Sequence, residues 1–237
     1  MRKLLLTTAA VAAAIAGAVA GAVAGEPSIG TFTDTRDGQT YKTVKIGKQT
    51  WMARNLNYKT DNSWCYKNSA DSCKKYGRLY NWDAAVKACS AGYHLPSREE
   101  WDILGKAIGD EEMKKEIEMD RDNWVHWLGA AKKLKSKSGW NWYKPDNKSG
   151  NGTDRFGFSA LPGGYRDYRD LREYSTGRLD RFSGVGYFGY WWMATEESGD
   201  AYYLYMSIHS DHVGEKGHLY YNVKNEGYSV RCVADSK

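Results

Sequence analysis

Cysteine is scarce in this chain, and its placement restricts the class of protein. Four cysteines occur among 237 residues, and none precedes Cys65. A lipid-anchored lipoprotein start, which needs an early cysteine, is therefore not supported. No two cysteines have the CxxC-type spacing of zinc sites, so a zinc site is not supported either.

An excess of charge of one sign is also missing. The chain has 34 Lys and Arg against 29 Asp and Glu, and loss of Arg2 and Lys3 with the leader described below leaves 32 against 29, or +3. The two signs are well mixed, which argues against a nucleic-acid-binding protein. One local group of lysines is expected to be the solvated end of a helix. Its members are Lys132, Lys133, Lys135 and Lys137.

Catalytic motifs are absent as well. The sequence has no nucleophile elbow, phosphate-binding loop or dinucleotide fingerprint. Glu99-Glu100 and Glu196-Glu197 are adjacent carboxylates, whereas glycosidases need two carboxyls that face each other across a cleft. His209 and His212 flank Asp211 in an expected hairpin turn, and we interpret them as solvated loop residues. We therefore predict that the protein is not an enzyme.

The first residues predict export. Arg2 and Lys3 give a positive start, Leu4 to Ala16 form an apolar run, and Ala22-Val23-Ala24 is a small-x-small cleavage pattern. We expect residues 1–24 to be a signal peptide. The segment is short, rich in Ala and Gly, and followed by no stop-transfer charges, so no transmembrane anchor is expected after cleavage. Residues 25–237 suit a single domain, secreted to the periplasm, the outer surface or the medium.

In an oxidising compartment, four cysteines are expected to form two disulfides. Spacing alone allows three connectivities. Cys65 and Cys73 are separated by a short polar stretch that could form a closed loop, leaving Cys89 to reach Cys232. That second bridge would close most of the domain, and in the chain-entropy model a loop of this length contributes about 5 kcal/mol.

The pattern of the first half predicts strands and then helices. Asp37-Gly38 is a turn dipeptide between Thr31–Thr35 and Thr40–Ile46, which indicates a hairpin that Gln49–Leu56 continues. Apolar residues then recur at helical spacing. These are Trp82, Ala85, Val86 and Cys89. A second helix is expected to begin at Ser97, which forms a capping box with Glu100, and to end at Gly109.

The second half is richer in loops. We predict one or two surface helices in residues 110–135 and a long loop with embedded aromatics from Lys135 to Arg155. Five short strands should follow. They are Phe156–Leu161, Tyr187–Thr195, Ala201–Ile208, Gly217–Val223 and Tyr228–Ala234. This order predicts an α+β fold with antiparallel sheets, two or more helices and long loops.

Several ordered segments together resemble the Fibrobacter succinogenes major paralogous domain, a family of exported bacterial proteins, from about Thr33 to Asp235. They are Asp37–Tyr41, Gln49–Tyr58, Ala85–Cys89, Gly92–Trp101, Gly157–Arg166, Trp191–Glu197 and Gly227–Cys232. By more distant analogy, Cys89, Gly92–Trp101 and Cys232 resemble the C-type lectin-like fold. That resemblance implies a disulfide between the first helix and the last strand.

Neither metal nor oxidase chemistry follows from the lectin-like resemblance. Sugar-binding C-type lectins hold calcium through Glu-Pro-Asn or Gln-Pro-Asp and through Trp-Asn-Asp, and the corresponding region has neither. Asn81-Trp82-Asp83 has similar letters but lies at a helix start, where Asp83 is expected to be a cap. Oxygen donors in the long loop fail the calcium-loop pattern, so we interpret them as turn residues and expect no cofactor. They are Asp146, Asn147, Asn151 and Asp154. Formylglycine-generating enzymes share the lectin-like fold and a stretch similar to Leu161–Arg166, but they need a late cysteine pair, and only Cys232 lies there.

Aromatic residues provide the candidate ligand site. The chain has 10 Trp and 18 Tyr, more than a core of this size requires, and amphipathic rings are suited to stacking on sugars. The first candidates are Trp140, Trp142 and Tyr143 in the long loop. For Trp140 and Trp142, the competing interpretation is that they fill a second core. The second set is Tyr165, Arg166, Tyr168 and Arg169, in which Arg offers a planar donor fork. The remaining large indoles, Trp51, Trp82, Trp101, Trp191 and Trp192, are expected in the core.

The sequence therefore predicts an exported, non-catalytic binding module that recognises carbohydrate, either plant cell-wall polysaccharide or a surface glycan. Family members occur in a fibre-degrading bacterium, which implies cellulose or hemicellulose as a target. One alternative is a structural or adhesion protein of the cell envelope that binds other proteins. Another is an enzyme of the formylglycine-oxidase type.

Overall fold

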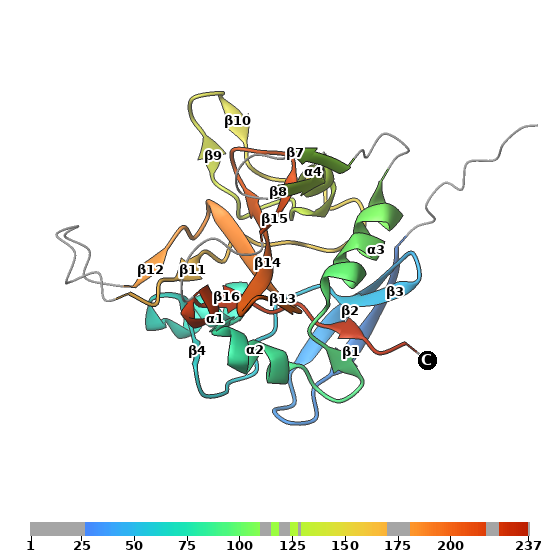
Figure 1. Cartoon of the computed structure of the whole chain (residues 1–237), viewed down its shortest axis with the longest axis vertical. Coiled ribbons are helices and arrows are strands. Elements are labelled where there is room, and N and C mark those ends of the chain that lie inside the picture. Colours follow the sequence, from blue (N-terminus) through green and yellow to red (C-terminus); the bar gives the residue numbers. More distant parts are fainter. Residues whose placement is uncertain are drawn as a thin grey trace, which may run out of the picture.

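Two sheets organise the chain. The structure is a computed structural model and describes residues 27–109, 115–118, 124–127, 129–169, 181–216 and 223–236. The first sheet has five strands in the order β1-β2-β3-β17-β6, all antiparallel (Figure 1). Their bounds are β1 Ser28–Thr33, β2 Thr40–Ile46, β3 Gln49–Met52, β17 Val233–Ala234 and β6 Tyr93–His94. The last described strand is thus inserted between strands from the first half of the chain.

The second sheet has eight strands in the order β4-β5-β16-β13-β14-β15-β8-β7. Its bounds are β4 Ser63–Trp64, β5 Leu79–Tyr80, β16 Tyr228–Ser229, β13 Phe188–Glu197, β14 Asp200–Ser207, β15 Val213–Lys216, β8 Trp124–Trp127 and β7 Lys115–Glu118. All neighbours are antiparallel except β13 and β16, which make one parallel pair. Two small ribbons complete the strands. They are β9 Trp142–Tyr143 with β10 Lys148–Ser149, and β11 Tyr165–Arg166 with β12 Phe182–Ser183.

Four α-helices and two 3-10 helices lie in the described residues. The α-helices are α1 Ala70–Tyr76, α2 Trp82–Ala88, α3 Arg98–Ile108 and α4 Ala130–Leu134, and the 3-10 helices are η1 Tyr66–Asn68 and η2 Val223–Asn225. The predicted capping box of α3 is confirmed, because Ser97 and Glu100 bond reciprocally to each other's backbone N–H groups. The predicted cap of α2 is wrong: Asn81 accepts the Ala84 N–H, and Asp83 lies in the first turn. The α+β class with antiparallel sheets is confirmed.

The prediction of one or two surface helices in residues 110–135 is wrong at residues 115–118 and 124–127. Its described parts form β7 and β8 before the short α4. β8 pairs with β15, with Trp127 opposite Val213. A Trp-Val-His-Trp run favours a strand, and the partner strand lies far along the chain, so local helical spacing was a poor guide.

Phe156–Leu161 is not the predicted strand either. Gly157 and Ser159 have φ of +69° and +53°, which are incompatible with an extended strand. Side chains satisfy much of this backbone instead. Asp154 accepts the Ser159 N–H, and Arg231 donates to the Phe158 carbonyl. The hairpin of β1 and β2 and the long strands β13 and β14 match the prediction, while residues 217–222 of the predicted Gly217–Val223 strand lie outside the described residues.

Two disulfides close the domain, as predicted. Cys65 and Cys73 are bonded across a separation of 8 residues, and that short loop contains η1 and the start of α1, a helix that the sequence did not predict. Cys89 and Cys232 are bonded across a separation of 143 residues. The second bridge ties the C-terminal end of α2 to the chain just before β17.

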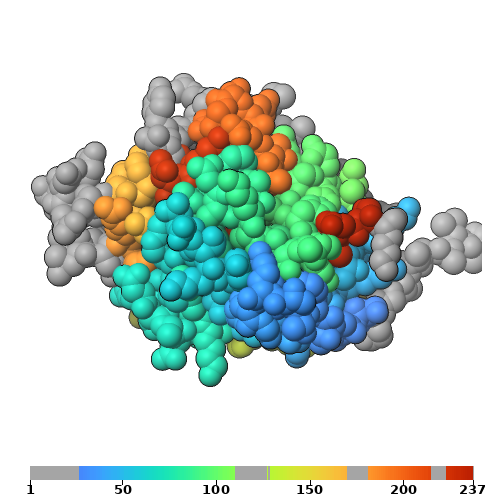
Figure 2. Space-filling model, turned by 90° about the horizontal axis from the view of Figure 1, so that it is seen from below, coloured from blue at the N-terminus to red at the C-terminus, as the bar shows by residue number. Residues whose placement is uncertain are grey.

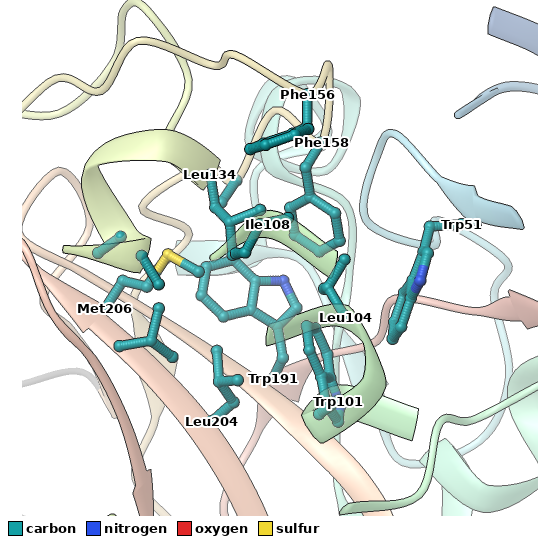
Figure 3. Close-up of a cluster of buried hydrophobic side chains, with 14 of the residues drawn as sticks. Trp51, Trp101, Leu104, Ile108, Leu134, Phe156, Phe158, Trp191, Leu204 and Met206 are labelled. Carbon is teal, nitrogen blue, oxygen red and sulfur yellow. The ribbon is translucent and has the colours of Figure 1, made fainter. Parts of the chain in front are cut away.

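The main core lies between the first sheet, α3, α4 and the strands β13 and β14. Trp51, Trp101 and Trp191 are fully buried there, and Trp191 lies at the centre of the labelled side chains in Figure 3. Trp192 belongs to a second cluster with Tyr80 and Tyr228. Four of the five indoles predicted in the core are therefore buried. Trp82 is half-buried and donates its Nε1–H to the Met193 carbonyl.

A polar hub joins these layers. Arg231 is fully buried and donates to Asn55 Oδ1 and to the carbonyls of Met52 and Phe158. The same Asn55 oxygen accepts the Trp191 indole N–H at 2.9 Å. Burial lowers the pKa of Arg231 to about 9. Residues from four of the family-like segments thus meet at one interior point, which gives them a role in the fold.

Candidate ligand-binding surface

Trp140 belongs to the core. It is 4% exposed, its Nε1–H donates to the Ala160 carbonyl at 2.9 Å, and its ring lies 4.8 Å from the Lys135 ammonium. A buried indole with its polar tip bonded has no face open to a ligand. We therefore leave Trp140 out of the ligand-binding surface.

Lys135 is also buried, so the prediction of a solvated lysine cluster is wrong at this position. Its ammonium donates to the carbonyls of Ser207 and Ser210 at 2.5 and 2.8 Å. Burial lowers the pKa of Lys135 to about 8. The ammonium joins the end of α4 to the turn after β14 and lies against Trp140, two residues before β9.

Trp142 has the opposite environment, although it lies two residues from Trp140. It is 54% exposed on β9, opposite Ser149 of β10. Its Nε1–H donates to Asn147 Oδ1 at 3.2 Å, across the turn of the ribbon. The bond restrains the ring while most of its surface stays open, which is the condition for a preorganised stacking platform.

Tyr143 points to the other side of the ribbon, because neighbouring residues of a strand face opposite ways. Its ring packs against the core and stands edge-on to His209, with centroids 4.7 Å apart. His209 in turn lies 5.9 Å from the ring of Phe188. Tyr143 therefore anchors the ribbon to β13, and Trp142 is the ring that this ribbon presents.

Tyr187 is an exposed aromatic that sequence analysis missed as a ligand candidate, because it was assigned to a strand. It is 45% exposed and directly precedes β13. The Asn141 N–H donates to the Gly186 carbonyl at 2.8 Å, so the main chains next to Trp142 and Tyr187 are hydrogen-bonded to each other. The two glycines before it, Gly184 and Gly186, were the available signal of a turn that leaves Tyr187 outside the strand, which begins at Phe188.

The second predicted set lies on β11. Tyr165 stands edge-on to Tyr190, with centroids 5.4 Å apart, and its ring edge lies beside Gly184. The guanidinium carbon of Arg166 lies 3.9 Å from the centre of the Trp64 indole. Arg169 makes a two-point ion pair with Asp167, and the N–H of Arg169 donates to the same carboxylate. Arg169 is thus engaged within its own loop, whereas Arg166 is stacked and partly open to solvent.

One short segment joins the two sets. Phe182 pairs with Arg166, and Gly186, four residues later, bonds to Asn141. Four residues span at most roughly 14 Å. Figure 1 accordingly has the β9–β10 ribbon and the β11–β12 pair on the same side of the molecule. We call the surface formed by Trp142, Tyr187, Tyr165, Arg166 and Trp64 the aromatic band.

The face seen in Figure 2 is built mostly by other segments. Blue residues of β1 and β2 and the cyan to green segments with α1, α2 and α3 occupy most of it, while gold and orange residues lie at its left edge and further orange residues at its upper edge. The first half of the described chain thus covers one side of the domain, and the band is formed mainly by the second half.

The side-chain oxygens of the long loop that were considered as metal ligands each accept hydrogen bonds from a different part of the protein. Asn151 Oδ1 accepts the Trp140 N–H, Asn147 accepts the Trp142 indole N–H, and Asp154 accepts from Ser159. His212 Nδ1 accepts the Gly129 N–H, and Asp211 pairs with Lys148. Among the described residues, no group of three or more His, Cys, Asp and Glu side chains is arranged to hold a metal ion.

Fold and disulfides together define a two-sheet α+β domain closed by a long-range bridge, with aromatics exposed along one side. The chain belongs to the family of the Fibrobacter succinogenes major domain, whose family model matches residues 44–234. No curated protein and no solved structure matches the chain. In the part of the chain that the structure describes, no helix has both the length and the apolar character needed to cross a membrane.

Proposed function

We propose that this protein is an exported, non-catalytic binding module that recognises polysaccharide or surface glycan through the aromatic band. The observation that carries the proposal is Trp142, which is 54% exposed while its indole N–H is held by Asn147. An exposed large aromatic on a restrained ribbon is suited to stacking on the apolar face of a sugar ring. Tyr187 and Tyr165 extend this surface along the 182–187 segment.

Export is supported by two independent features. The first 24 residues have a positive start, an apolar run and a small-x-small pattern. All four cysteines are paired, and two structural disulfides are typical of an oxidising compartment. The pairing also removes the free thiol that the formylglycine-oxidase alternative requires.

We further propose that the domain is C-type lectin-like. The support is its covalent and sheet topology: a disulfide joins the end of α2 to the segment before the last strand, and β17 pairs with β3 and β6. Fold alone does not define a ligand. The glycan proposal therefore depends on the band and not on this likeness.

The test is binding of the purified protein to a panel of insoluble plant polysaccharides and soluble glycans, with and without chelator. Trp142→Ala should weaken saturable binding about tenfold, since loss of one aromatic stacking contact costs ~1.5 kcal/mol. Ile103→Ala, an exposed apolar residue on α3, is the matched control and should bind like wild type. If no glycan binds the folded wild type, the proposal fails, and an envelope protein that binds other proteins becomes the better hypothesis.

A further inference from the structure

Main-chain hydrogen bonds and an aromatic contact fix the position of Arg166. Its main chain is bonded to Gly227 in both directions, at 2.9 and 2.7 Å, and to β12. Its guanidinium carbon lies over the Trp64 ring, 3.9 Å from the ring centre. Within the described part of the chain, its side-chain N–H groups have no hydrogen-bond acceptor. A positioned, half-buried guanidinium with unused donors is uncommon, because buried polar groups are normally paired.

Glu226 lies near Arg166 and, like it, has a polar group without a hydrogen-bond partner among the described residues. The residue is 9% exposed and Oε2 has no hydrogen-bond partner, while the Tyr168 N–H bonds to the carboxyl group. The charged groups that face it are Asp167, Arg169 and Arg166. Two phenols, Tyr190 and Tyr228, also lie close enough to interact with its charge.

The charge state of the Glu226 carboxyl group follows from its burial and its charged neighbours. Burial, followed by repulsion from Asp167, raises the pKa of Glu226 to about 8. At neutral pH it is therefore protonated and does not neutralise Arg166. Asp167 is already paired with Arg169, and Arg181 adds positive charge near Arg166. Among the described residues, no carboxylate is therefore hydrogen-bonded to the Arg166 guanidinium at the end of the aromatic band.

We propose that Arg166 binds a carboxylate, and that the ligand of the band is a polysaccharide containing uronic acid residues. The inference rests on the proposed glycan function and names the class of glycan. A guanidinium fork matches a planar carboxylate in a two-point hydrogen bond, and the Trp64 face supports a coplanar pair. A tetrahedral dianion would lack that planarity and would place a second negative charge near Asp167. Trp142 and Tyr187 would stack on neighbouring sugar rings of the same chain.

The experiment is calorimetric titration of the purified protein at pH 6.5 with oligogalacturonate and with its methyl ester. The two probes share one backbone and differ in the charge of the carboxyl group. Wild type should bind the acid about tenfold more tightly, the equivalent of one charge-assisted contact. Arg166→Gln should bind both forms with the weaker affinity. Monomeric galacturonate should bind at least tenfold more weakly than the oligomer, and equal binding would rule out a polymer ligand.

Trp142→Ala separates this inference from the proposed function. It should weaken both probes by the same factor and leave the preference for the acid unchanged. If wild type binds acid and ester equally and Trp142→Ala weakens both, the glycan function stands and the carboxylate inference falls. If neither probe nor any other glycan binds the folded wild type, both fall.

A pH series gives a second readout that does not depend on the folding of Arg166→Gln. The preference for the acid should decline as pH rises through about 8, because ionised Glu226 would neutralise Arg166 and repel the ligand. Glu226→Gln, which cannot ionise, should keep the preference to pH 9. A wild-type preference that is constant from pH 6.5 to 9 would exclude the role of Glu226.

Discussion

His94 connects the C-terminal segment to α3 through two carboxylates. Its Nε2 lies 2.7 Å from Glu100 Oε1, and its Nδ1 lies 2.6 Å from Asp235 Oδ1. Burial lowers the pKa of His94, but the hydrogen bonds to Asp235 and Glu100 outweigh that effect and raise it above its usual value. The protonated imidazole is therefore the form that the fold favours.

The consequence is a pH-dependent stability. Stabilisation by protonated His94 is fully present below the unfolded-state pKa of about 6.5 and is lost as pH rises through the raised folded-state value. The melting temperature of wild type should fall over that window, and His94→Gln should show a shallower slope there. His212→Gln leaves both carboxylate contacts in place and should keep the wild-type slope. Equal slopes for all three proteins would contradict the assignment.

The contrast between Trp140 and Trp142 marks the limit of sequence analysis at this scale. Both lie in the same Gly- and Asn-rich stretch, and neither belongs to a periodic stripe. Trp142 lies on the two-residue strand β9, whereas Trp140 precedes that strand and is buried with its indole N–H bonded to the Ala160 carbonyl. The partner of Trp140 is distant in sequence. The sequence therefore predicted which segment carries an exposed aromatic ring, but not which of its residues.

Among the elements, the segment after β10 is held against α4 by its backbone. N–H groups of Gly152, Thr153, Asp154 and Arg155 donate to the carbonyls of Ser136, Lys132, Lys135 and Lys133, respectively. The end of the helix thus finds acceptor partners in the loop, which is how orphan carbonyls are normally satisfied. The predicted long loop is therefore an ordered support for the ribbon.

Gly152→Ala tests that support. A Cβ at this position would lie 2.3 Å from the Lys135 carbonyl oxygen and 2.8 Å from that of Lys132, and backbone atoms cannot move aside easily. We expect the free energy of unfolding to drop by about 1–3 kcal/mol, the usual cost of overpacking. Urea unfolding would measure it, with the exposed neighbour Lys137→Ala as a control that stays near wild type. A Gly152→Ala protein as stable as that control would show that the contact is loose.

Elements differed in how well the sequence predicted them. The hairpin around Asp37-Gly38, α2, α3, β13 and β14 were recognised because their signals are local: a turn dipeptide, a capping box and sustained periodicity. β7 and β8 were missed because β8 pairs with the distant strand β15, and α1 was missed because it is short and begins inside the first disulfide loop. Elements that depend on nonlocal strand pairing or that are very short were thus the ones that sequence analysis missed.

For the whole molecule, the two disulfides should contribute unequally. In the chain-entropy model, removal of the Cys89–Cys232 bridge costs about 5 kcal/mol and removal of the Cys65–Cys73 bridge about 2.5 kcal/mol, because the closed loops differ so much in length. Guanidinium unfolding of the double Cys→Ala variants of each pair would measure both losses. A larger loss for the Cys65–Cys73 pair would show that local strain or residual structure outweighs loop length.

Family membership and fold class could be predicted because the identifying segments converge on the interior. Asn55, Trp191 and Arg231 come from three of these segments and meet at one hub. Trp142 and Tyr187, by contrast, lie outside them. Part of the candidate surface therefore lies outside the segments that define the family. Those segments could not reveal the identity of the ligand.

The first described strand, β1, and the last, β17, belong to the same five-stranded sheet, at the side of the molecule away from the β9–β10 ribbon (Figure 1). Any tether or affinity tag joined near Asp235 would therefore leave the domain with the aromatic band directed outward. The protein can be immobilised on a sensor chip or bead by that end with its candidate face unobstructed, and the same polarity would suit display on a stalk.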